Sequence, residues 1–176
     1  GSSAYDATLT TLTVPTAPLT SVTNTQLLLS ATNGGIVDAT AKNDLETVGN
    51  AQISTTQSKY GGASMSFNGT NSYLKGVSTT NFNFGTGDFT IEMWAYFVST
   101  ADSGGLGVGL ISNPTGTYAT IYSSVNGGTT LTFYNGAAIV SGTIALTTWQ
   151  HVAVTRYNGT VRILDRKSTR LNSSHT

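Results

Sequence analysis

The segment GDFTIEMWAYF, residues 87–97, alternates apolar and polar side chains in the pattern of an extended strand. Successive side chains of a strand point to opposite faces, so alternate residues share a face. The apolar face carries Phe89, Ile91, Met93, Ala95 and Phe97. The other face carries Thr90, Glu92, Trp94 and Tyr96. This alternation predicts a strand with one face in a hydrophobic core and one amphipathic face.

A second segment, TWQHVAVTRYNGTVRI at residues 148–163, alternates in the same way on both sides of a turn. Val152 and Val154 fall on one face, and the opposite face carries His151, Ala153 and Thr155. The Asn-Gly pair at residues 158–159 supplies a two-residue turn, so the segment predicts a β-hairpin. We expect a third segment, FNGTNSYL at residues 67–74, to build the same sheet.

The three segments, in this order, resemble the laminin G-like branch of the concanavalin A-like lectin/glucanase superfamily. The order is F-N-G-T-x-x-Y-L, then G-D-F-T-I-E-x-W, then W-x-H-V-A-V-T-R with a short glycine turn. The resemblance implies an all-β fold, a concanavalin A-like jelly-roll sandwich of two antiparallel sheets, truncated at the C-terminus. Together with the matching polar faces, it also implies that Glu92 and His151 meet across neighbouring strands.

Both ends of the chain differ from the middle. Residues 1–20, with Pro15 and Pro18, resemble the tail of a preceding repeat followed by a proline-containing linker. Residues 21–164 are expected to form one incomplete laminin G-like module. Residues 165–176, DRKSTRLNSSHT, resemble a translated sequencing adapter, so we expect them to be a non-native tail.

The composition favours the same fold class and argues against nucleic acid and membrane as partners. Charged residues make up only 9% of the chain and hydrophobic residues 38%, while Thr and Gly suit strands and tight turns. Without residues 165–176, five basic and seven acidic side chains remain, which argues against a nucleic-acid partner. The chain has no cysteine, and apolar runs such as residues 26–29 are too short for membrane insertion. The only expected helical turn lies near residues 44–46.

Carboxylate chemistry is one candidate activity, because glycan hydrolases occur in this superfamily. Retaining hydrolysis requires two carboxyl groups about 5 Å apart. Glu92 has only Thr90, Trp94 and Tyr96 as neighbours on its face, and none of these is an acid. The other acids of residues 21–164 occur in contexts typical of turns, namely Asp38, Asp44, Glu46, Asp88 and Asp102. We therefore expect no enzymatic activity, and a structural role for His151.

Calcium is a possible cofactor, since several relatives use it and no other cofactor is indicated. Its preferred ligands are carboxylate, amide and carbonyl oxygens. The densest such cluster consists of Asp38, Asn43 and Asp44. We favour turn formation over calcium binding for these residues and expect no cofactor, because Asp and Asn side chains often accept hydrogen bonds from backbone groups nearby in sequence.

Sugar binding would use aromatic side chains as stacking surfaces. The candidate ligand-binding residues are Trp94, Tyr96, Glu92, His151, Tyr118 and Tyr122. We expect a non-catalytic glycan-recognition or spacer module of a large surface protein, foremost a phage tail or virion structural protein. A bacterial extracellular adhesin, or an accessory or degenerate domain of a secreted glycoside hydrolase, is the alternative. The expected partners are a cell-surface glycan or neighbouring repeats, and the expected location is the virion or the cell surface.

Overall fold

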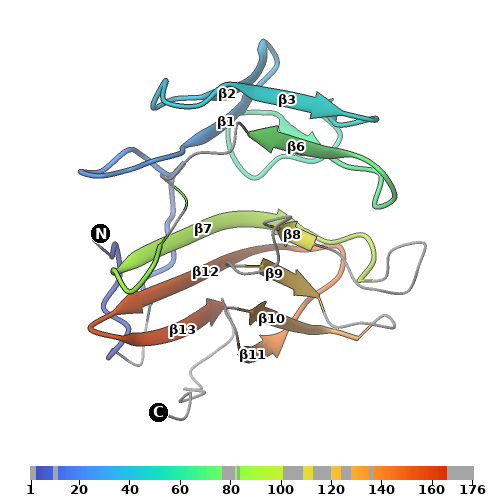
Figure 1. The fold of residues 1–176 in the computed structure, drawn as a ribbon. Coiled ribbons are helices and arrows are strands. Elements are labelled where there is room, and N and C mark those ends of the chain that lie inside the picture. Colours follow the sequence, from blue (N-terminus) through green and yellow to red (C-terminus); the bar gives the residue numbers. More distant parts are fainter. Residues whose placement is uncertain are drawn as a thin grey trace. The chain divides into compact units, whose positions relative to one another are not determined.

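The computed structural model describes residues 3–9, 12–76, 82, 84–100, 109–112, 120–123, 128–134 and 137–165. In this part of the chain all regular elements are β-strands, so the predicted all-β fold class is confirmed (Figure 1). None of the described residues forms a helix of the length and apolar character needed to cross a membrane.

The chain divides into two compact units, one of Gly1–Val14 with Phe84–Thr176 and one of Pro15–Asn83. Residues 3–9 and 12–14 thus belong to the same unit as the sheets that follow residue 84. That residues 1–20 originate from a preceding repeat stays a prediction.

The smaller unit, Pro15–Asn83, is built from short antiparallel strand pairs. Its strands are β1 (Leu29–Thr32), β2 (Gly35–Asp38), β3 (Leu45–Val48), β4 (Gln52–Ser54), β5 (Ser64–Ser66) and β6 (Tyr73–Gly76). β1 pairs with β2, β3 with β6, and β4 with β5. FNGTNSYL contributes β6, which pairs with β3 and not with the sheet of the other two segments, so the expected single sheet is wrong.

The helical turn expected near residues 44–46 is also wrong. Leu45 begins β3, and every residue of this strand pairs with a residue of β6, from Leu45 with Gly76 to Val48 with Tyr73. Thr47 and Val48 are β-branched, which favours the extended conformation once a partner strand is available. Pairing with a distant segment therefore overrides the weak local preference.

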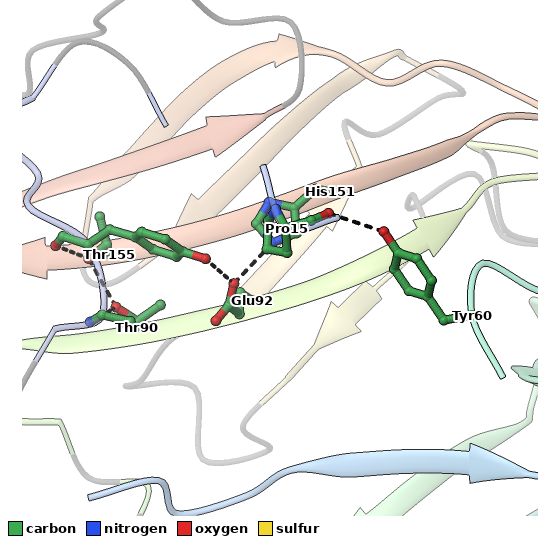
Figure 2. Close-up of polar contacts among 8 residues, drawn as sticks. Pro15, Tyr60, Thr90, Glu92, His151 and Thr155 are labelled. Carbon is green, nitrogen blue, oxygen red and sulfur yellow. Dashed lines mark hydrogen bonds and ion pairs between the residues drawn. The ribbon is translucent and has the colours of Figure 1, made fainter. Parts of the chain in front are cut away.

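Two features of the smaller unit bring segments that are distant in sequence close to each other. Gly49, after β3, has a φ of 63°, and a Cβ at this position would lie 2.5 Å from the carbonyl oxygen of Asn71. Only glycine allows this backbone approach without strain. The Tyr60 hydroxyl donates a hydrogen bond to the Pro15 carbonyl oxygen at 3.1 Å, which ties the beginning of the unit to its middle (Figure 2).

The larger unit is a sandwich of two antiparallel sheets. Its strands are β7 (Phe89–Tyr96), β8 (Gly109–Ile111), β9 (Thr120–Ser123), β10 (Thr130–Tyr134), β11 (Ala138–Thr143), β12 (Trp149–Tyr157) and β13 (Thr160–Asp165). One sheet has the order β13-β12-β7, and the other has the order β11-β10-β9-β8 (Figure 1). The predicted hairpin is confirmed: β12 and β13 flank Asn158 and Gly159, which have φ values of 49° and 79°.

The core lies between these two sheets. Phe133 of β10 and Phe89 of β7 face each other with ring centroids 6.0 Å apart. The buried apolar residues around them are Phe97, Ile121, Leu131, Ile144, Val152, Val154 and Ile163. The predicted inward row of β7 is confirmed, because Phe89 and Phe97 are buried and the residues between them pack against this core.

Candidate functional site

The outer face of the β7–β12 pair carries most of the polar and aromatic side chains predicted to form a site. Residues opposite each other in antiparallel strands share a face and lie within contact distance. From one end of this face to the other, the pairs are Tyr96 with Trp149, Trp94 with His151, Glu92 with Ala153, and Thr90 with Thr155. Aromatic rings thus collect at one end, hydroxyl groups at the other, and the carboxylate lies between them.

Three half-buried side chains, Trp94, Tyr96 and Trp149, form what we call the aromatic strip. The Tyr96 and Trp149 ring centroids are 5.5 Å apart and the planes are inclined by 58°. The ring centroids of Trp94 and His151 are 5.4 Å apart, and their planes are also inclined by 58°. Tilted rings at these separations interact favourably, so the strip is held in a defined orientation. Trp149 was missing from the predicted site residues, although its parity with His151 places it on the same face.

Glu92 is the polar centre of the face. Its Oε2 lies 3.0 Å from Nε2 of His151, which confirms the predicted pairing (Figure 2). The His151 side chain is fully buried, and the Glu92 side chain is 21% exposed. Among the described residues, nothing bonds to Nδ1 of His151. The tautomer with the proton on Nε2 suits this environment, because the ring then donates to Glu92 and leaves no buried N–H unpaired.

The N-terminal segment Ser3–Leu9, here called the strap, lies across the hydroxyl end of the face. The Tyr5 hydroxyl donates to Oε2 of Glu92 at 2.5 Å. The Ala4 N–H donates to Thr90 Oγ1 at 2.8 Å, and Thr155 Oγ1 donates to the Tyr5 carbonyl oxygen at 3.1 Å. These contacts join residues more than 80 positions apart. No local pattern in the sequence indicates them, because residues 1–20 resemble the tail of a preceding repeat followed by a linker.

Burial raises the pKa of the Tyr5 phenol above its ordinary value, and the hydrogen bond to Glu92 and the charge of that carboxylate raise it further. Ionisation of Tyr5 would place a second negative charge beside Glu92 and remove the donated proton. The phenol therefore acts as a hydrogen-bond donor throughout the neutral pH range. Its contact with Glu92 is a fixed part of the site and links the strap to the sheet.

We expect Tyr5→Phe to lower the free energy of unfolding by about 1 kcal/mol, because a partly exposed bond to a carboxylate is lost. Because the pKa of Tyr5 is raised in the folded state, its contribution to the free energy of unfolding is fully present below the ordinary tyrosine pKa of about 10. This contribution falls as pH rises through the higher folded-state pKa. Urea titrations at pH 8 and above measure both effects. Tyr134→Phe, at an exposed position, is the control. Equal midpoints for the two variants at pH 8 would contradict the assignment.

The remaining aromatic candidates do not join the aromatic strip. Tyr122 lies in β9, which belongs to the other sheet of the sandwich. Tyr118 lies outside the described residues. The structure thus brings together Glu92, Trp94, Tyr96 and His151 of the predicted set, and it adds Trp149 and Tyr5 to them.

The predicted calcium candidates lie in the smaller unit, where Asp38 is the centre of a hydrogen-bonded turn. The residue is 6% exposed, and its carboxylate accepts bonds from backbone N–H groups and from two side chains. The backbone donors are those of Leu28, Thr40, Lys42 and Asn43, and the side-chain donors are those of Thr40 and Asn43.

Burial by itself would raise the pKa of Asp38, but the bonds from Leu28, Asn43 and Thr40 outweigh burial and hold the pKa below its ordinary value. A calcium ion binds oxygen atoms and would be repelled by N–H groups directed at the same carboxylate. This donor set therefore fits a turn better than a cation. Within the described part of the chain, no bond joins Asp44 to Asp38, and no group of three or more acidic or histidine side chains is placed to hold a metal.

Comparison with known proteins adds one finding. A laminin G model, described as the concanavalin A-like lectin/glucanases superfamily, matches residues 68–164, more than half of the chain. The matched range contains β7 and β12 with the aromatic strip, Glu92 and His151. No curated protein and no solved structure gives a significant match.

Proposed function

The chain belongs to the concanavalin A-like lectin/glucanase superfamily, and from this premise we propose that its larger unit is a non-catalytic glycan-recognition module. Membership by itself indicates a carbohydrate-binding or structural module. The observation that carries the finer proposal is the aromatic strip, whose three side chains are half-buried and held by neighbouring side chains. Partly exposed aromatic rings beside a few fixed polar groups are typical of small-ligand sites. Glu92 supplies such a polar group next to the strip.

The surroundings of Glu92 support recognition more than hydrolysis. A retaining hydrolase needs a second carboxyl group at about 5 Å and a free carboxylate to act as nucleophile. Here Tyr5 and His151 both bond to Oε2 of Glu92, and no residue that shares this face of β7 and β12 with Glu92 is an acid. Glu92 therefore serves to hold the strap and the histidine in place.

We further propose that the module belongs to a large multi-domain surface protein, foremost a phage tail or virion structural protein. The low charge and the Thr- and Gly-rich composition suit a repeated surface module. A single module would bind a cell-surface glycan weakly, and repetition would strengthen attachment. A bacterial adhesin, or an accessory domain of a secreted glycoside hydrolase, is the second candidate. The neighbouring genes separate these possibilities: capsid and baseplate genes accompany the first, and a signal peptide with an anchor accompanies an adhesin.

We expect the labelled chain to bind a subset of sugars on a glycan array, and Trp149→Ala to weaken that binding at least about tenfold, as loss of an aromatic anchor commonly does. Tyr96→Ala should have a similar effect. Tyr134→Ala is the matched control, because Tyr134 is an exposed aromatic residue on β10 of the other sheet. Unfolding midpoints measured in parallel show whether each variant is folded.

Each outcome of this experiment has a defined meaning. Binding that persists unchanged in folded Trp149→Ala and Tyr96→Ala would place the glycan elsewhere. An array without any bound sugar would contradict glycan recognition and leave a spacer function for the module.

A further inference from the structure

The strap contacts the β7–β12 face through groups that recognise a peptide backbone. Thr90 Oγ1 accepts a hydrogen bond from the N–H of Ala4, and Thr155 Oγ1 donates one to the carbonyl oxygen of Tyr5. Ser3 Oγ hydrogen-bonds to both threonine hydroxyls, at 3.0 Å in the case of Thr90. Hydrogen bonds to backbone groups secure an extended segment in place, and side-chain contacts then select its sequence.

Side chains of the strap add this selectivity. The Tyr5 hydroxyl reaches Glu92, and Ala7 has no exposed surface. At the end of the strap, Nη1 of Arg162 on β13 donates to the carbonyl oxygen of Leu9 at 3.3 Å. The face therefore fits a segment of the pattern Ser-x-Tyr-x-Ala, in which a tyrosine hydroxyl meets a carboxylate and a small residue is enclosed.

The strap and the sheet that it contacts are far apart in the sequence. The strap precedes residue 10, whereas the sheet begins at Phe89, and the whole unit Pro15–Asn83 lies between them in sequence. Pro15 and Pro18 follow the strap and disfavour helix or ladder formation at this point. All of these contacts are noncovalent, so the strap of another chain offers the same groups, which is the condition for segment exchange.

We propose that the outer face of β7 and β12 is a peptide-binding surface whose partner is the strap of a second copy of this chain. Exchange of the strap links consecutive copies, each sheet holding the N-terminal segment of its neighbour. The inference deepens the proposed partnership with neighbouring repeats and rests on it for its biological meaning. Glycan binding is measured separately on the array, so either proposal can fail while the other stands.

The chain contains no cysteine, so introduced thiols test the exchange without interference. Ser3→Cys and Thr90→Cys are made in separate chains of different mass, unfolded together, refolded at high concentration and oxidised. The two replaced oxygen atoms lie 3.0 Å apart, a separation that a disulfide can bridge. Mass spectrometry then measures the mixed disulfide dimer.

In the matched control, Thr8→Cys is paired with Thr90→Cys in place of Ser3→Cys. Thr8 is an exposed strap residue whose hydrogen bonds go to Asp6 and not to the sheet. A chain carrying both Ser3→Cys and Thr90→Cys, oxidised at low concentration, shows whether the strap reaches the sheet at all. We expect this double variant to close its bond within one chain, and the mixed dimer to exceed the Thr8 control about tenfold and to increase with concentration.

Two results would overturn the proposal. The first is a mixed dimer no more abundant than the Thr8 control while the double variant closes its internal bond, because the strap would then bind only its own sheet. The second is a double variant that forms no bond, because the strap would then not lie on the face.

Discussion

Phe133→Ala is expected to lower the free energy of unfolding of the larger unit by about 3–5 kcal/mol, the usual loss when a buried phenylalanine is truncated. Phe133 has no exposed surface, and its ring faces Phe89 of the opposite sheet at 6.0 Å. Truncation removes contacts from both layers and leaves a cavity that neither sheet can fill without moving. Urea unfolding followed by tryptophan fluorescence measures the effect, because both tryptophans, Trp94 and Trp149, lie in this unit.

Two further variants show whether the loss comes from the core. Phe133→Leu keeps most of the apolar volume and should cost less than about 1.5 kcal/mol. Phe67→Ala removes a ring that is 46% exposed and should change stability by no more than about 0.5 kcal/mol. If Phe133→Ala were as mild as Phe67→Ala, the two sheets would not share a core at this position and the sandwich would be incorrect.

Sequence alone predicted those parts of the fold that depend on local order. The alternation along β7 identified the inward row from Phe89 to Phe97, because the period of two leaves no other arrangement for an extended strand with one apolar face. The Asn-Gly pair at residues 158–159 located the hairpin, since few other residues adopt its positive φ angles. The alternation of side chains along the two strands, together with the family resemblance, correctly predicted that Glu92 meets His151.

The parts that sequence did not predict depend on long-range pairing. β6 alternates well enough to be a strand, but its sequence does not indicate that β3 is its partner. The strap contains no strong alternation and lies in a segment that resembles the tail of a preceding repeat, so its docking on Thr90 and Thr155 follows only from the tertiary structure. Local pattern thus identifies elements and their faces, whereas the choice among distant partners depends on how all the surfaces fit.

The second large effect is expected for Asp38→Asn, which should lower the stability of the smaller unit by about 3 kcal/mol. The carboxylate accepts bonds from four backbone N–H groups and two side chains, and Asp38 itself is only 6% exposed. A carboxamide has one acceptor oxygen, and its NH₂ group would point at donors such as Nδ2 of Asn43. Several buried donors would lose their partner at once. Chemical unfolding monitored by far-UV circular dichroism measures the change.

The pH dependence of the wild-type chain gives an independent test of the same contact. Because the pKa of Asp38 is lowered in the folded state, its contribution to the free energy of unfolding is present above the ordinary aspartate pKa of about 3.9. This contribution is lost as pH falls through the lower folded-state pKa. The stability difference between the wild type and Asp38→Asn should therefore be constant from pH 8 to about pH 5 and should shrink below about pH 4. A difference that grows on acidification would reverse the sign and rule out a carboxylate stabilised by hydrogen bonds.

The same variant separates the hydrogen-bonded turn from a calcium site. Asp44→Asn, at an exposed neighbouring position, is the control and should change stability by no more than about 0.5 kcal/mol. Because N–H and O–H donors already converge on Asp38, calcium should not raise the unfolding midpoint and a chelator should not lower it. A midpoint that rises with calcium in the wild type, but not in Asp38→Asn, would show that these donors give way to a cation and that Asp38 is a ligand.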